Sequence, residues 1–223
     1  MRFLILFLFS IFYISPSNGE NATSSKGIIA TSNPHASKAA HEIIRKGGNA
    51  IDAAVAVQLV LTLTEPQATG IGGGAFMLYW DAKKSKLYAI DGREKAPSKA
   101  KEDLFLNKDG NKIKFYPDAV VGAKSVGVPG IIKLLEDTHK KFGKLAWNDL
   151  FGYAIELSEN GFSVSPALHN TLGYLSYLKT IEPAGSLYYE KNSDGEKVPV
   201  PIGHILKLSL IHISEPTRPE RIA

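Results

Sequence analysis

The sequence predicts a mixed α/β fold, written α/β (α+β), and three observations support this class. Helical signals cover residues 34–46 and 50–63 near the N-terminus. Two apolar stretches around a polar turn follow at 75–94, and further helical signals begin near Pro129. Helices that flank an extended pair are typical of proteins that combine helices and sheet in layers.

The first predicted elements are a short strand at 27–31 and a helix that begins at Asn33-Pro34. Asparagine is a good helix cap, and proline suits a first helical turn. Gly47-Gly48 ends the helix, because glycine is favoured just beyond a helix C-terminus. Small and apolar side chains share one face of this helix, namely Ala36, Ala39, Ala40, Ile43 and Ile44.

A second helix is predicted over residues 50–63. Asn49 is its cap, and Asp52 in its first turn favours the positive end of the helix dipole. The stretch is apolar on every side but too short to span a membrane. It is therefore predicted to be a buried core helix.

The extended pair is predicted as a β-hairpin, with strands at 75–80 and 87–94 around a lysine-rich turn. Its second strand ends in Asp91, Gly92, Arg93 and Glu94. The polar stretch 95–114 has no hydrophobic period and is predicted as a loop.

Three helices are predicted in the second half of the chain. Pro129 lies in the first turn of one, which runs to about Lys141. Asn148 caps the next, which Gly161 closes, and Ser165-Pro166 begins the third.

Composition excludes several function classes. The net charge of +4 comes from scattered lysines, so no basic stripe suggests nucleic-acid binding. The chain has no cysteine, which excludes disulfides, thiolate zinc sites and a cysteine nucleophile. No two of the six histidines form the H-E-x-x-H pair of zinc proteases. No metal and no cofactor are predicted.

Both ends of the chain are predicted to lie outside the functional region, which is taken as 20–207. Residues 1–19 have one arginine, an apolar run and small residues, as in a secretory signal peptide. The mature protein is then periplasmic or secreted, with no stable membrane span. LSLIHISEPTRP resembles the translation of a sequencing-library adapter, so 208–223 is interpreted as an artefact of a truncated reading frame.

Residues 70–74 contain four glycines and formally satisfy a dinucleotide-binding fingerprint. That fingerprint needs a strand before it and a helix after it, whereas here a helix precedes and a strand follows. We therefore expect no phosphate site. The glycines are predicted to form a sharp turn that uses positive φ and close backbone packing.

Arg93 is the candidate binding residue. It lies at a strand end beside a glycine, so its guanidinium could bind a carboxylate through two hydrogen bonds. The alternative is a local ion pair with Asp91 or Glu94. Ser125 lacks the glycine of a nucleophile elbow and is interpreted as a turn or cap residue, and Asp52 as a helix-dipole residue.

Three segments together resemble the γ-glutamyltransferase (glutathione hydrolase) family. They are NPHASKAAHEIIRKGGNAIDAAVA, EPQATGIGGGAFMLYWDA and AIDGREKAP, and GVPGIIKLLEDTHKKFGKLAWNDLFGYAIELSENGFSV extends the match. The resemblance covers residues 27–178, in the family's order and spacing. It is far more specific than a single glycine motif.

The resemblance implies the αββα sandwich of the N-terminal nucleophile hydrolases, incomplete here. It also implies a zymogen that cleaves itself into a large and a small subunit, whose new N-terminal threonine attacks the γ-glutamyl amide. The γ-glutamyl group of glutathione and related compounds then passes to water or an amine. Arg93 matches the family residue that holds the substrate α-carboxylate, and this favours binding over a local ion pair.

The resemblance also predicts what this chain lacks. The nucleophilic threonine lies downstream, so the fragment contains no catalytic residue and is expected to be inactive without the small subunit. Related acylases for β-lactam side chains and poly-γ-glutamate processing enzymes share these motifs. A non-catalytic periplasmic binding protein and a non-enzymatic remnant are the alternatives from other classes.

Overall fold

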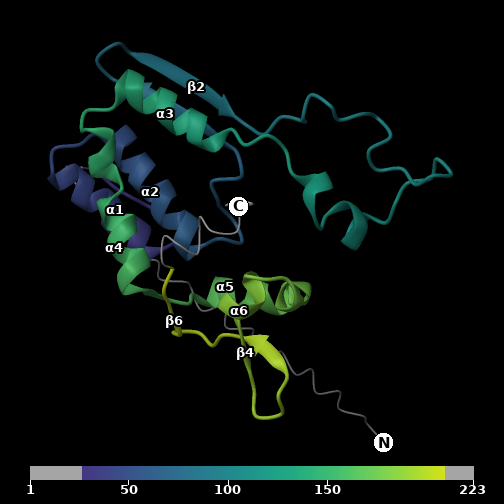
Figure 1. Ribbon diagram of the computed structural model, residues 1–223. Helices are drawn as coiled ribbons and strands as arrows, with labels where there is room; N and C mark the ends of the chain where they lie inside the picture. Colours follow the sequence, from purple (N-terminus) through teal and green to yellow (C-terminus); the bar gives the residue numbers. More distant parts are fainter. Residues whose placement is uncertain (1–26, 209–223) are drawn as a thin grey trace, which may run out of the picture.

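The computed structural model describes residues 27–208, where the chain forms six α-helices and six strands (Figure 1). The predicted signal peptide and all but the first residue of the adapter-like segment lie outside this part of the chain. The helices are α1 (Pro34–Arg45), α2 (Ala50–Thr64), α3 (Ile131–Phe142), α4 (Gly152–Asn160), α5 (Pro166–Tyr174) and α6 (Ala184–Leu187). The strands are β1 (Ala75–Asp81), β2 (Lys86–Gly92), β3 (Phe162–Ser163), β4 (Tyr189–Lys191), β5 (Lys197–Pro199) and β6 (Ile205–Leu206).

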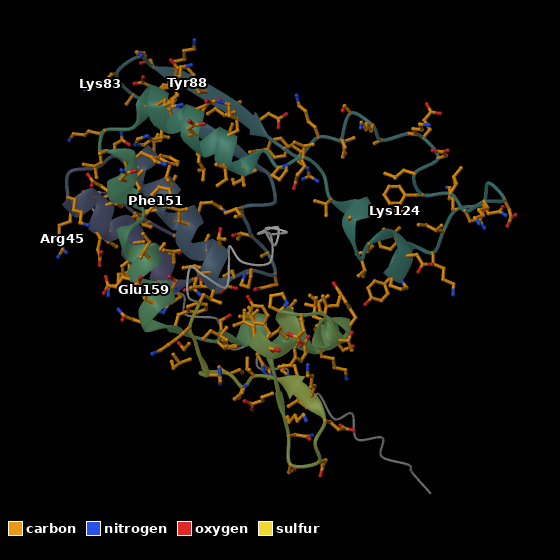
Figure 2. All side chains as sticks on the ribbon, in the orientation of Figure 1. Arg45, Lys83, Tyr88, Lys124, Phe151 and Glu159 are labelled. Carbon is orange, nitrogen blue, oxygen red and sulfur yellow. The ribbon has the colours of Figure 1, made fainter. Side chains whose placement is uncertain are left out.

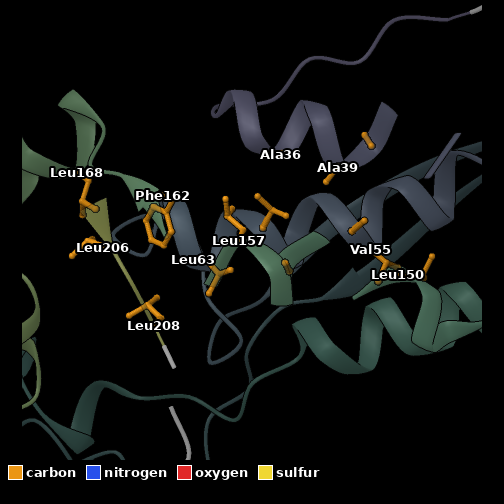
Figure 3. Packing of buried hydrophobic residues seen from close by; sticks show 14 of the residues in the cluster. Ala36, Ala39, Val55, Leu63, Leu150, Leu157, Phe162, Leu168, Leu206 and Leu208 are labelled. Carbon is orange, nitrogen blue, oxygen red and sulfur yellow. The ribbon is translucent and has the colours of Figure 1, made fainter. Parts of the chain in front are cut away.

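The core is built around α2, which contacts α1, α3 and α4. Val55 and Val60 of α2 are fully buried, as the all-apolar sequence of this helix predicts. Ala36 and Ala39 lie on the side of α1 that faces α2, and their small side chains allow the two helices to approach closely (Figure 3). The expectation of a buried core helix is confirmed.

Both predicted caps of the N-terminal helices are confirmed. The Asn33 side chain accepts a hydrogen bond from the backbone N–H of His35. The Asn49 side chain accepts from the N–H groups of Ile51 and Asp52, and the Asp52 carboxylate accepts from the N–H of Asn49. This reciprocal capping box satisfies N–H groups that would otherwise lack partners at the start of α2.

The hairpin β1–β2 is antiparallel, as predicted, with Ala75 opposite Gly92 and Trp80 opposite Leu87. Its inner face packs on α3, which lies along β2 in Figure 1. The ring of Phe142 at the end of α3 lies 4.8 Å from the rings of both Tyr79 and Tyr88. This aromatic cluster anchors the hairpin to the helical core.

The outer face of the hairpin, defined here as Phe76, Leu78, Trp80 and Leu87, is apolar and open. Leu78 is 73% exposed and Trp80 56% exposed. A strand pair that is apolar on both faces differs from the usual half-solvated antiparallel sheet. Within residues 27–208 the strands form three two-stranded sheets, so the mixed α/β class is confirmed and the full αββα sandwich stays a prediction.

The second half of the chain extends the core. The Ser165 side chain accepts from the N–H of Leu168 and caps α5, as predicted. Phe162 in β3 and Leu206 in β6 are buried next to Leu168, and Figure 3 shows Leu208 beside them. Leu208 is 7% exposed, and its N–H donates to the carbonyl of Ser158.

Three expectations about local structure need correction. Residues 27–31 form no strand, because no neighbouring strand in residues 27–208 offers them a ladder. Asn148 caps no α-helix but lies inside a 3-10 turn over Trp147–Leu150, after which α4 begins at Gly152. Pro129 precedes α3, whose cap is Gly130.

The segment between β2 and α3 reaches away from the packed helices (Figure 1). The predicted loop at 95–114 is confirmed, and it continues through short helical turns to Ser125. Lys95 and Val128 close this segment at its base with two backbone hydrogen bonds. Figure 2 shows Lys124 on this segment, far from Arg45 on α1.

None of the helices within residues 27–208 has both the length and the apolar character needed to cross a membrane.

Candidate functional site

The glycine loop, residues 70–74, lies between the C-terminus of α2 and the first residue of β1. The carbonyl of Gly73 accepts the N–H groups of Gly130 and Ile131, both at 3.1 Å, so the loop docks directly on the start of α3. A Cβ added to Gly74 would lie 2.6 Å from the carbonyl oxygen of Gly92. Close backbone packing therefore requires glycine here, as predicted.

The predicted positive φ is wrong for the loop. None of its glycines adopts a left-handed conformation, whereas Gly47 (φ 91°) and Gly161 (φ 94°) at helix ends do. At Gly74 the loop uses glycine for space rather than for handedness, because neighbouring backbone occupies the position of a side chain. At Gly70, Gly72 and Gly73 an added Cβ would meet nothing closer than 3.6 Å. No helix begins at the loop, and this supports the expectation against a phosphate site.

A buried carboxylate fixes the segment that enters the loop. Glu65, which is 4% exposed, accepts hydrogen bonds from Asn33 Nδ2 at 2.8 Å and from Gln67 Nε2 at 2.6 Å. Asn33 is also the cap of α1. Glu65 thus connects the first turn of α1 to the end of α2, and the sequence analysis did not single it out.

Arg93 lies immediately after β2 and lines a hollow together with Gly72 of the loop. Its Nε is 3.0 Å from Glu94 Oε2, in an ion pair whose N–H is not aligned for a hydrogen bond. The Arg93 side chain is 68% exposed, while that of Glu94 is 31% exposed. The backbone N–H of Arg93 donates to the Asp91 carboxylate at 2.8 Å. The local ion pair is therefore present, yet the Arg93 side chain as a whole is mostly exposed.

Two adjoining hollows flank Glu94. The first, of about 430 Å³, is lined by Gln58, Pro66, Ala68, Thr69, the four glycines of the loop and Glu94. The second, of about 400 Å³, contains Arg93 and Glu94 on one side and Gly127 on the other. We call the second one the arginine hollow. Its remaining lining residues are Gly72, Lys95, Ala96, Ser125 and Val126.

Ser125 and Asp52 have structural roles, as predicted. The Ser125 hydroxyl donates to the carbonyls of Val120 and Gly122, which stabilises a turn. The Asp52 carboxylate is fully buried and accepts the N–H groups of Asn49, Lys144 and Leu145. The Ser125 hydroxyl is hydrogen-bonded to backbone carbonyls and not to a general base, so it lacks the pairing of an activated nucleophile.

No group of three or more histidine, aspartate or glutamate side chains within residues 27–208 is arranged to hold a metal ion. What the hollows offer chemically is a cationic fork, a carboxylate and the backbone of a glycine loop. Such a set has the chemistry to bind and orient an anionic group, and it does not by itself break a bond.

Residues 36–203 match the family model described as Gamma-glutamyltranspeptidase. The chain belongs to the gamma-glutamyltranspeptidase family. It is 44% identical over 142 residues to the glutathione hydrolase proenzyme of Bacillus subtilis (strain 168), a match that covers 64% of this chain and 24% of that protein. It is also 39% identical over 155 residues to the acylase ACY 1 proenzyme of Pseudomonas sp. (strain V22), covering 68% of this chain and 28% of that one.

The fold matches a solved member of the gamma-glutamyltranspeptidase family as well. The crystal structure of Helicobacter pylori gamma-glutamyltranspeptidase superposes with a TM-score of 0.75 at 32% identity, over 84% of this chain and 52% of that one. The chain spans about a quarter of the length of the two curated relatives. The family resemblance predicted from the motifs is confirmed.

The sequence predicted two parts of the site but not their proximity. Arg93 and the glycine loop were both identified, but they lie close together only because β2 and α3, which are distant in the sequence, pack against each other. Glu94 was considered only as a rival partner of Arg93. Its neighbour Gly127 was missed, and the sole signal for it was its place two residues before Pro129.

Proposed function

We propose that this chain is the substrate-anchoring part of a gamma-glutamyltranspeptidase precursor. The complete enzyme cleaves the γ-glutamyl amide of glutathione and related compounds and passes the γ-glutamyl group to water or to an amine. The observation that carries the proposal is Arg93, whose exposed guanidinium opens on a hollow of about 400 Å³ in a chain of this family.

Arg93 is proposed to bind the α-carboxylate of the γ-glutamyl donor. A guanidinium has five N–H donors in a planar fork, and it binds carboxylates through paired hydrogen bonds. The glycines of the loop add no side chains to the lining of the two hollows. The donor can therefore approach the backbone between Gly72 and Glu94, which line both hollows.

The bond-breaking group is proposed to come from the small subunit of the same precursor. Its N-terminal threonine hydroxyl attacks the γ-carbonyl carbon, the amide C–N bond breaks, and the amine leaves with a proton. Water or an acceptor amine then attacks the γ-glutamyl ester and releases the threonine. Export through the predicted signal peptide is part of the same proposal.

The test is to express the complete precursor that contains this segment and to follow its processing and activity. We expect two subunits on a denaturing gel and hydrolysis of a chromogenic γ-glutamyl anilide. The matched α-glutamyl anilide, whose free carboxylate is on the other carbon, should remain intact. A precursor that is processed but cleaves neither γ-glutamyl anilide nor glutathione would refute the substrate class.

Replacing Arg93 tests the anchor. Arg93→Ala in the complete enzyme should raise KM about thirtyfold, with a much smaller change in kcat, since loss of one partner of a hydrogen-bonded charge pair that the bound donor covers costs about 2 kcal/mol. Steady-state kinetics with the γ-glutamyl anilide measure both constants. Arg45→Ala, on the last turn of α1, is the control and should leave KM unchanged. An unaltered KM for Arg93→Ala would contradict the anchoring role.

An acylase that acts on β-lactam side chains is a second candidate, because one relative is named an acylase proenzyme. It would use the same self-processing and the same hollows. Comparing hydrolysis of a β-lactam acyl amide with that of glutathione separates the two, and the gamma-glutamyltranspeptidase proposal requires glutathione to be the better substrate.

A further inference from the structure

We infer that Glu94 is a positioning residue, which holds the Arg93 guanidinium in the orientation that receives a substrate carboxylate. This inference rests on the proposed function, because it concerns how the anchoring arginine is aimed. It assigns Glu94 a role through Arg93 and no contact of its own with the reacting atoms.

The ion pair uses only one edge of the guanidinium. Glu94 Oε2 lies 3.0 Å from Nε of Arg93. The two terminal nitrogens of the fork are therefore available for a second carboxylate. Arginine side chains have many rotamers, so an exposed arginine without a partner presents its fork in many directions. A carboxylate fixed behind Nε reduces that freedom before the substrate arrives.

Glu94 can serve as the fixed partner because it is itself held in a slot between glycines. An added Cβ would lie 2.8 Å from Glu94 Oε2 at Gly74 and 2.9 Å from Glu94 Cβ at Gly127. At Gly73 it would lie 3.7 Å from Glu94 Oε1, in ordinary contact. Glycines from two segments that are far apart in the sequence thus leave the room that this one side chain occupies.

The burial of the two partners agrees with this division of roles. The Glu94 side chain is 31% exposed and its Oε2 atom is fully covered, whereas the Arg93 side chain is 68% exposed. The more buried carboxylate is the fixed member, and the exposed guanidinium is the member that meets the ligand. Asp91 adds to the arrangement by accepting the backbone N–H of Arg93 at 2.8 Å.

Two possible roles of Glu94 predict opposite changes in KM when its charge is removed, so an experiment can distinguish them. If Glu94 acted only through its negative charge, its removal would strengthen the attraction between Arg93 and an anionic substrate, so KM would fall. If Glu94 orients Arg93, its removal frees the guanidinium and KM rises. The sign of the change in KM distinguishes the two roles.

The experiment measures kcat and KM of the complete, processed enzyme with the γ-glutamyl anilide. We expect Glu94→Gln to raise KM about tenfold with kcat changed far less, as expected when substrate binding is lost and chemistry is retained. Glu94→Asp keeps the charge but is one methylene shorter, and it should raise KM by a similar factor. Glu136→Gln removes a carboxylate that pairs with Lys140 on α3, and it should leave KM unchanged.

The double variant shows whether Glu94 acts through Arg93. In the Arg93→Ala background, Glu94→Gln should change KM by less than about twofold, because the two side chains work as one unit. An unchanged or lowered KM for Glu94→Gln, or a wild-type KM for Glu94→Asp, would overturn the inference while leaving the Arg93 anchor intact. An unaltered KM for Arg93→Ala alone would instead remove the proposed function on which the inference rests.

Discussion

Asp52 is fully buried at the start of α2, and its carboxylate joins two distant parts of the chain. It closes the capping box with Asn49 and accepts the N–H groups of Lys144 and Leu145, which follow α3. His139 Nε2 lies 3.3 Å from its Oδ1. One side chain thus fixes both the beginning of the core helix and the turn beyond α3.

Replacing Asp52 should therefore destabilise the protein strongly. Asp52→Asn keeps the shape but turns one acceptor into a donor that faces backbone N–H groups, and buried donors without partners cost about 2 to 4 kcal/mol in total. Thermal unfolding of the complete precursor, followed by circular dichroism, measures the loss. Asp149→Asn, at an exposed position in a 3-10 turn, is the control and should change the melting temperature little.

The sequence predicted the local role of Asp52 in the first turn of α2 but not its contacts with distant residues. Its place in the first turn of α2 follows from local spacing, because a cap and the residue three positions later interact within one turn. The contacts to Lys144 and Leu145 span more than ninety positions and depend on how α3 packs on α2. The same limit applies to Glu94, whose slot is formed in part by Gly127.

At the scale of elements, β2 and α3 approach each other closely. A Cβ on Gly92 would lie 2.5 Å from Cβ of Leu134, and one on Gly130 would lie 2.2 Å from the carbonyl oxygen of Gly92. With no side chain between them, the end of β2 sits directly against α3. The position of Arg93, the next residue after this contact, depends on it.

Gly92→Ala should force β2 and α3 apart and lower stability by about 1 to 3 kcal/mol, the usual cost of overpacking a well-packed core. Gly173→Ala is the matched control. Gly173 lies in α5 with nothing within 4 Å of an added Cβ, so alanine should stabilise the helix by about 0.5 to 1 kcal/mol. Opposite shifts in melting temperature are expected, and equal shifts would contradict the packing argument.

Elements defined by local chemistry were predicted well, and those that depend on distant partners were not. The starts of α1, α2 and α5 follow from asparagine or serine caps, which act within one turn. Residues 27–31 have the composition of a strand, but a strand forms only where an adjacent strand provides backbone hydrogen-bond partners. The glycine loop was predicted as a turn, while the carbonyl that requires glycine at Gly74 belongs to β2.

At the scale of the described residues 27–208, the open outer face of the hairpin is a departure from a closed fold. Four large apolar side chains, each more than half exposed, lie on one side of a two-stranded sheet. Isolated apolar residues on a surface need no explanation, but a contiguous strip marks an interaction surface. In the complete precursor we expect this face to be covered, as the sandwich implied by family resemblance requires.

Introducing charges on the outer face of the hairpin should change the yield of the segment 27–208 and that of the complete precursor in opposite directions. Leu78→Lys together with Trp80→Lys should increase the soluble yield of the segment 27–208, because it breaks the exposed apolar strip. In the complete precursor the same pair should reduce the yield of processed enzyme, since burying two unpaired charges is costly. Yields on denaturing gels measure both effects, with Lys83→Glu in the hairpin turn as control, and parallel changes in the two contexts would refute the covered face.

The two backbone hydrogen bonds between Lys95 and Val128 join the ends of the segment between them, so that residues 95–128 form a closed loop. Its tip is a tight turn in which the side chain of Asn107 accepts the N–H groups of Asp109 and Asn111. The entropy of closing such a loop rises only slowly with its length, by about 0.6 kcal/mol for each doubling. The tip is therefore a place where an affinity peptide or a fluorescent reporter can be carried, without altering how β2 meets α3 or how Arg93 is presented.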